Sequence, residues 1–281
     1  MSLNREDPYW PEFRPALCEA LFEAVEIDDV VDPEVSLPDP IDLACTDEEL
    51  QRCFALCLQF WRRGFAREEL LALVKLLQKT ADLDAGQRQE YKLIRAKYKH
   101  LRFALMLYSK DHRVPKLFGA TVAIMGHLQD SFRNGQRWHT LAYAALLRAL
   151  LVLPIWNHVQ RRVAACSMTT APDFLAYRKA DMDRLRHMLE QPLFTGTQFH
   201  AMRKIVSKLV SFYDTLRSLE PNEHSYKMSR YLSAINGLMG SRHDEMVEQA
   251  GRGERAYNSL APLDEDIRSR LEVLAEAMNS V

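Results

Sequence analysis

The stretch MGHLQD at residues 125–130 has a counterpart later in the chain, MGSRHD at residues 239–244. Each copy follows a segment with basic residues at helical spacing, which begins near Lys92 in the first case and near His200 in the second. A repeated segment usually forms the same structural unit twice. We therefore expect two similar helical units that pack about a pseudo-twofold axis and share the groove between them.

Both basic segments have the spacing of a stripe along one helix. Their charges recur at i, i+3, i+7 and i+10 in the first segment, and at i, i+3, i+4 and i+8 in the second. The candidate polyanion-binding residues are Lys92, Arg95, Lys99, Arg102, His200, Arg203, Lys204 and Lys208. Like charges at this spacing destabilise an isolated helix, so acidic side chains elsewhere or a bound anion must compensate them. Arg and Lys both bind phosphate, and His200 would add charge below about pH 6.5.

Apolar residues recur at intervals near 3.6 through most of the chain, and no long alternation indicates a strand. Thr46 and Glu49 have the spacing of a capping box, which predicts a helix that runs to about Arg63. A long helix is predicted to begin at Asp84 or Gly86. The sequence thus predicts an all-α protein of about ten to twelve helices.

Charge is distributed unevenly along the chain. Residues 1–49 contain fifteen Asp and Glu against two Arg, whereas residues 50–281 contain 35 Lys and Arg against 23 Asp and Glu. We assign residues 1–45 to an acidic, proline-containing N-terminal arm. The arm could mask the basic surface, bind a protein partner, or have no specific partner. The formal net charge of −1 makes nucleic acid an unexpected partner.

The remaining residues, 46–281, are predicted to form the helical domain, with internal repeats at about 84–190 and 191–281. The most apolar run, residues 141–156, is too short to span a bilayer and is predicted to be a buried helix, so we expect no membrane partner. The chain has five cysteines and no CxxC pair, which favours small buried thiols. With no export signal at the N-terminus, these features predict a cytoplasmic protein.

The two basic segments and the motifs after them resemble the CHAD family, the conserved histidine α-helical domain. The resemblance covers roughly residues 84–281. The residues that carry it are Lys92, Arg95, Lys99, Gly126, Gln129, Asp130, His200, Arg203, Lys208, Gly240, His243 and Asp244. It implies two helical bundles that enclose a basic channel, in which inorganic polyphosphate binds. We expect a binding protein without catalytic residues, metal or cofactor.

Two other functions remain open. The first is a helical protein–protein adaptor, suggested by the acidic arm and by the aromatic residues among its prolines. The second is a metal-dependent phosphohydrolase of the HD type, suggested by the adjacent His243 and Asp244. Such a metal site needs further nitrogen and oxygen ligands. The available candidates are His200 or His224 and Asp264 or Asp266.

Overall fold

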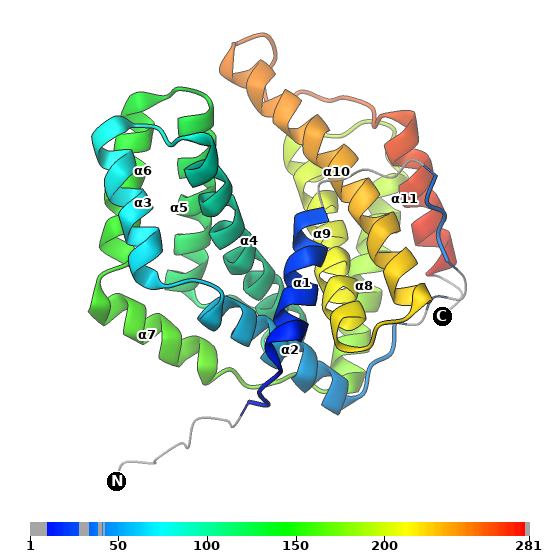
Figure 1. The fold of residues 1–281 in the computed structure, drawn as a ribbon. Coiled ribbons are helices and arrows are strands. Elements are labelled where there is room, and N and C mark those ends of the chain that lie inside the picture. The colour runs from blue at the N-terminus through cyan, green and yellow to red at the C-terminus, as the bar shows by residue number, and fades with distance from the viewer. Residues whose placement is uncertain (1–9, 28–33, 39–40, 42, 279–281) are drawn as a thin grey trace. The chain divides into compact units, whose positions relative to one another are not determined.

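The computed structural model of the chain describes residues 10–27, 34–38, 41 and 43–278. Within these residues the chain forms eleven helices and no strand, which confirms the predicted all-α class (Figure 1). The helices are α1 (Pro15–Ile27), α2 (Asp47–Arg63), α3 (Arg67–Thr80), α4 (Ala85–Tyr108), α5 (Lys116–Arg133), α6 (Arg137–Leu150), α7 (Leu153–Ala164), α8 (Ala171–Leu189), α9 (Gly196–Leu219), α10 (Glu223–Gly251) and α11 (Glu265–Ala277).

The chain divides into two compact units. Unit 1 comprises residues 1–18 and 51–169, and unit 2 comprises residues 19–50 and 170–281. The division after Thr169 differs from the predicted repeat boundary near residue 190. The difference arises because α8 packs against α9 and α11, and so belongs with the second basic helix.

Unit 1 is built around the basic helix α4, which packs against α3 and α5, while α5 and α3 in turn pack against α6. The apolar stripe of α4 is buried as predicted, at Ile94, Tyr98, Leu101, Leu105 and Tyr108. Trp61 of α2 lies in the middle of this core. Its ring centroid is 5.5 Å from that of Tyr98 and 5.4 Å from that of Phe118. Edge-to-face contacts of this kind stabilise a core beyond the area that they bury.

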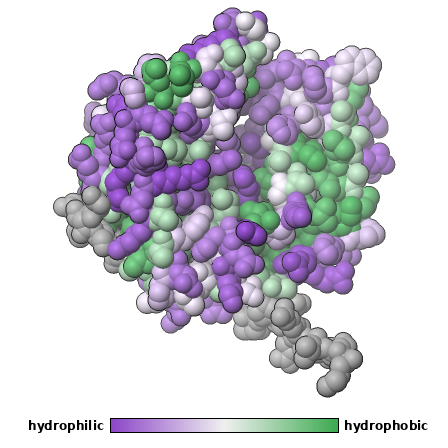
Figure 2. Space-filling view, turned by 180° about the vertical axis from the view of Figure 1, so that it is seen from behind, coloured by the Kyte–Doolittle hydropathy of each residue, from purple (hydrophilic) through white to green (hydrophobic). Residues whose placement is uncertain are grey.

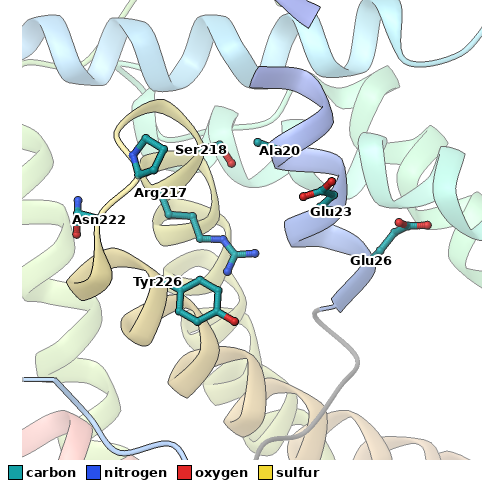
Figure 3. Close-up of a pocket in the computed structure, with 8 residues that line it drawn as sticks. Ala20, Glu23, Glu26, Arg217, Ser218, Asn222 and Tyr226 are labelled. Carbon is teal, nitrogen blue, oxygen red and sulfur yellow. The ribbon is translucent and has the colours of Figure 1, made fainter. Parts of the chain in front are cut away.

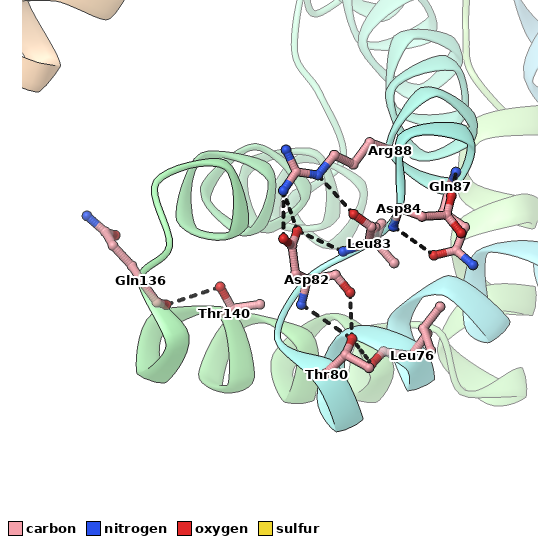
Figure 4. Close-up of polar contacts among 9 residues, drawn as sticks. All are labelled: Leu76, Thr80, Asp82, Leu83, Asp84, Gln87, Arg88, Gln136 and Thr140. Atoms are coloured by element: carbon pink, nitrogen blue, oxygen red, sulfur yellow. Dashed lines mark hydrogen bonds and ion pairs between the residues drawn. The ribbon is translucent and has the colours of Figure 1, made fainter.

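The turn between α3 and α4 determines where the basic helix begins (Figure 4). Asp84 Oδ1 accepts a hydrogen bond from Gln87 N at 2.9 Å, and Gln87 Oε1 accepts one from Asp84 N at 3.1 Å. Arg88 donates to both carboxylate oxygens of Asp82 at 2.7 Å and to Leu83 O at 3.0 Å. The hydrogen bond from Arg88 lowers the pKa of Asp82. Of the two predicted starts, Asp84 and Gly86, this reciprocal capping identifies Asp84 as the residue that caps the helix.

The predicted capping box of α2 is also present. Glu49 Oε2 accepts a hydrogen bond from Thr46 N at 2.7 Å, and Thr46 Oγ1 accepts one from Glu49 N at 3.2 Å. The helix ends at Arg63, as predicted. Cys53 and Cys57, one turn apart on α2, are both fully buried, which confirms that they are core residues.

Parts of the described N-terminal segment pack against the unit to which each belongs. Trp10 Nε1 donates a hydrogen bond to Ala164 O at 2.8 Å, and the backbone of Phe13 makes two hydrogen bonds with the Gln59 side chain, at 2.9 and 2.8 Å. In unit 2, Leu21 of α1 is fully buried. Residues 1–9, 28–33, 39–40 and 42 of the predicted acidic arm lie outside the described residues.

In unit 2 the second basic helix, α9, packs against α8 and α10, and α11 packs against α8 and α10 (Figure 1). The apolar stripe of α9 is buried at Met202, Ile205, Val206, Leu209, Phe212 and Tyr213, and half-buried at Leu216. Thr195 caps α9 with the same reciprocal arrangement as Asp84 in unit 1, through Gln198. Each unit therefore contains a capped, 24-residue basic helix that packs on the helix with the Met-Gly motif.

No single helix in the described part of the chain is both long and apolar enough to cross a membrane. α6 and α7 together, bent by 68° at their junction, are the one pair there whose joint length and composition would allow it. However, α6 buries Thr140, Ala144 and Leu147 inside unit 1, so part of this helix pair packs in the protein core.

His100 of α4 is buried, with its ring centroid 6.0 Å from that of Phe60. Burial, with a smaller contribution from Lys99, lowers the pKa of His100 to about 3. In the unfolded chain the imidazole protonates near pH 6.5. The unfolded state thus binds more protons between these two values, and the folded state loses stability as the pH falls through this range.

We expect this histidine to lower the free energy of unfolding by about 2 kcal/mol as the pH falls from 7 to 5. Urea unfolding at several pH values should show that the His100→Gln variant lacks this part of the pH dependence. His158→Gln replaces an exposed histidine of unit 1 and is the matched control, which should keep the wild-type slope. A wild-type slope in His100→Gln would contradict the depressed pKa.

Arg178 of α8 is buried in the core of unit 2, with 1% of its surface exposed. Its guanidinium carbon lies 4.4 Å from the ring centroid of Phe212 and 5.5 Å from that of Phe174. Nε, Nη1 and Nη2 have no hydrogen-bond partner among the described residues. The cation–π contacts offset only part of the cost of removing this charge from water.

Replacing Arg178 with methionine should therefore raise the free energy of unfolding, by about 1–3 kcal/mol. Urea unfolding of Arg178→Met measures this change. Arg184→Met removes an exposed arginine from the same helix and should change stability little. If Arg178→Met is instead strongly destabilised, the guanidinium must be hydrogen-bonded in solution.

Candidate functional site

In unit 1, Arg95 of α4 lies against Gly126 of α5. A Cβ atom at Gly126 would be 3.2 Å from Arg95 Nη2, so a larger residue would push the guanidinium aside. Arg95 Nη1 also donates to Gln129 Oε1 at 3.3 Å. The MGHLQD motif thus has two local roles: its glycine makes room for the arginine, and its buried glutamine orients it.

Unit 2 repeats this contact. A Cβ atom at Gly240 of α10 would be 2.9 Å from Nη2 of Arg203, the i+3 residue of the second basic stripe as Arg95 is of the first. His243 stands where the first motif has Gln129. Its ring centroid lies 5.1 Å from that of His200, and its Nε2 is 3.1 Å from the Tyr257 hydroxyl oxygen. Two helix pairs, one in each unit, therefore hold an arginine over a glycine.

The other predicted residues of α4 have different environments. Lys92 is exposed, and Lys99 and Arg102 are half-buried. Lys99 Nζ lies 5.9 Å from the ring centroid of Phe103, and Arg102 Cζ lies 6.0 Å from it. Burial lowers the pKa of Arg102. These two cations are thus partly desolvated, which strengthens any interaction with an anion.

Lys208 of α9 is the one buried residue among the eight candidates. Its ammonium group forms an ion pair with Asp181 of α8 and donates to the Tyr177 hydroxyl at 2.8 Å. Burial lowers the pKa of Lys208, and the Asp181 carboxylate opposes this effect. The sequence predicted that acidic side chains elsewhere or a bound anion would compensate the basic stripes. For Lys208, the compensating group is the Asp181 carboxylate. Lys208 therefore holds α9 against α8. The other three candidates on α9, which are His200, Arg203 and Lys204, are half-buried.

One further buried lysine was not among the predicted residues. Lys97 of α4 donates a hydrogen bond to Gly64 O, at the end of α2, and its Nζ lies 5.9 Å from the Phe60 ring centroid. Burial lowers its pKa. Lys97 lies between the predicted residues Arg95 and Lys99. It was not predicted because the helical spacing that places those two residues on one face puts Lys97 on another face.

A cleft of about 450 Å³ lies in unit 2, between α1 and the turn from α9 to α10 (Figure 3). It is lined by Ala20, Glu23, Glu26, Arg217, Ser218, Pro221, Asn222 and Tyr226. Arg217 Cζ is 5.2 Å from the Tyr226 ring centroid, and its Nε is 3.9 Å from Asp214 Oδ1. Two exposed glutamates, Glu23 and Glu26, line the cleft together with Arg217, so the cleft is unsuited to a polyanion. No sequence pattern indicated it.

The geometry gives no support to the HD-type metal site. His243 Nδ1 is 3.8 Å from Asp244 Oδ1, but the carboxylates that were to complete the site lie beside arginines. Asp264 Oδ2 is 3.6 Å from the Nε of Arg242, and Asp266 Oδ1 accepts a 2.7 Å hydrogen bond from Arg270. Among the residues that the structure describes, no three His, Cys, Asp or Glu side chains are grouped so that they could hold a metal ion.

Comparison with known proteins adds no further assignment: no protein-family model matches this chain, and no curated protein or solved structure matches it either.

Proposed function

We propose that this protein binds inorganic polyphosphate or a similar polyanion, without catalysis, through the basic stripes of α4 and α9. The observation that carries this proposal is the repeated contact in which Arg95 and Arg203 each lie over a helix glycine. A glycine at this place leaves room for the guanidinium group. The Cβ atom of any other residue would occupy that room. An arginine held in one orientation loses less conformational freedom when it binds the oxygens of a phosphate.

The surroundings of the α4 stripe support an anionic ligand. The neutral amide of Gln129 accepts the hydrogen bond from Arg95, so the charge of Arg95 is not cancelled by a carboxylate there. Arg102 is partly desolvated beside an aromatic ring, and a bound anion would offset that cost. A phosphate chain can contact several such cations in succession, since helical spacing places them along one face.

On the α9 stripe of unit 2 the proposal assigns three ligand residues. His200, Arg203 and Lys204 are half-buried on this helix, whereas Lys208 is better assigned to the ion pair with Asp181. The proposed ligand residues are therefore Lys92, Arg95, Lys99, Arg102, His200, Arg203 and Lys204. This assignment agrees with the function that the CHAD resemblance implies, and membership of that family is part of the proposal.

Charge reversal at the two arginines tests the proposal. Titration of long-chain polyphosphate into the full-length protein at low salt should show binding by the wild type. Arg95→Glu and Arg203→Glu should each weaken it by roughly tenfold or more, because a hydrogen bond to a charged group contributes about 1.5–3 kcal/mol. Arg113→Glu, an equal charge change at an exposed position of unit 1, should bind almost as tightly as the wild type.

The dependence of polyphosphate affinity on salt concentration is a second test. When Lys and Arg neutralise phosphate charges, counterions are released on binding, so the affinity falls steeply as salt is added. Affinity that does not depend on salt would contradict the mechanism. If the folded wild type does not bind polyphosphate at all, the helical adaptor becomes the preferred function.

The role of the glycines leads to a separate prediction. In Gly126→Ala and Gly240→Ala the new methyl group should displace the flexible end of the arginine and weaken polyphosphate binding several-fold. Stability should stay equal or rise, because Ala is favoured over Gly in a helix by up to about 1 kcal/mol. Titration and thermal unfolding of the same samples measure the two effects.

Two glycines of the same helices are the matched controls. A Cβ atom at Gly119 of α5 would be 3.5 Å from Val114 Cγ1, and one at Gly251 of α10 would have no neighbour within 4 Å. Gly119→Ala and Gly251→Ala should therefore leave binding unchanged. Equal binding by all four variants would contradict the proposed use of the arginines.

A further inference from the structure

α6 presents an apolar stripe to solvent. Trp138 is 80% exposed and Leu146 is 50% exposed. Exposed alanines at positions 142, 145 and 149 complete the stripe, because residues at i, i+4, i+7 and i+11 from Trp138 share one helical face. Figure 2, which shows the molecule from behind, has hydrophobic residues gathered on one part of that face. The prediction that residues 141–156 are buried is therefore wrong for this face of α6.

The apolar surface continues into the junction with α7. Val152 is 43% exposed and Leu153 is 56% exposed, and Pro154 beside them is also exposed. Four of the large apolar side chains that this protein exposes thus belong to one helix and the turn that follows it. A single exposed leucine needs no explanation, but several large apolar side chains exposed on one helix and its following turn are typical of an interaction surface.

The charges that this segment itself carries are all positive, and the neighbouring Glu68 of α3 is paired with Arg67, which donates to Leu151 O. Residues 131–172 contain five arginines and no Asp or Glu. The arginines, at positions 133, 137, 148, 161 and 162, are all exposed, and in the described part of the chain none of them forms an ion pair. Arg148 donates to the Gln78 amide and Arg161 to a backbone carbonyl. The partner of this surface must therefore accept both apolar side chains and an excess of positive charge.

An anionic lipid bilayer meets both requirements. Helices that lie in the bilayer interface place Trp and Leu among the acyl chains and direct Arg or Lys to the headgroups. Tryptophan favours the boundary between the two regions, and each cation is attracted by the negative surface potential. A second copy of this chain fits less well, because a symmetric contact would bring together two surfaces that each have an excess of positive charge.

We propose that α6 and the beginning of α7 adsorb the protein to anionic membrane surfaces, with the helices in the interface and not across the bilayer. The expectation that the protein has no membrane partner rested on the length of the apolar run, which concerns spanning alone. This surface lies outside the α4 and α9 stripes, so the inference does not depend on polyphosphate binding.

Co-sedimentation of the full-length protein with vesicles tests this proposal. The wild type should bind vesicles of equimolar phosphatidylcholine and phosphatidylserine, and bind phosphatidylcholine vesicles at least tenfold more weakly. A Trp138→Ser, Leu146→Gln double variant should lose most of the binding. Leu260→Gln changes a 60% exposed leucine of unit 2 and should bind as the wild type does.

Arg95→Glu and Arg203→Glu distinguish this surface from the proposed polyanion site, and both should keep vesicle binding. If they lose it while the Trp138→Ser, Leu146→Gln variant keeps it, lipid phosphate is bound by the basic stripes and the proposal is overturned. It is also overturned if the wild type binds neither type of vesicle, or if it forms a dimer that only the double variant disrupts.

Discussion

The contact between an arginine and a helix glycine recurs in both units, and the proposed polyanion binding depends on it. Arg95 over Gly126 and Arg203 over Gly240 are made by the same two kinds of helix, once in each unit. A guanidinium can approach a helix backbone this closely only where no Cβ atom is in the way. The same glycine therefore brings the basic helix against its neighbour and determines where the charge lies.

Local rules were sufficient to predict the helices and several of their ends. The reciprocal capping at Asp84 and at Thr46 depends on residues three positions apart, so it can be read from the sequence and is found in the structure. Arg95 and Arg203 are likewise the i+3 residues of the two predicted basic stripes, and each lies over a glycine. In contrast, the division between the units depends on how α8 packs, which no local pattern describes.

The same distinction separates the predicted site residues. Helical spacing placed Lys208 on a basic stripe, but its environment is set by Asp181, which is 27 residues away and on another helix. For α6, apolar residues occur on more than one face, and composition alone does not tell which face the core uses. Thr140, Ala144 and Leu147 face the core, which leaves Trp138 and Leu146 in solvent.

Positive charge occurs in this protein in two physically different settings. On α4, cations lie beside neutral amides and aromatic rings, and one of them is held in a fixed orientation, which suits a ligand bound through directed hydrogen bonds. Around α6 and α7, the arginines are exposed and surround an apolar stripe, which suits an extended surface where only the sign of the charge matters. A polyanion in water offers nothing to the exposed Trp138, whereas a bilayer does. The two surfaces should thus differ in ligand because they differ in apolar content, although both are basic.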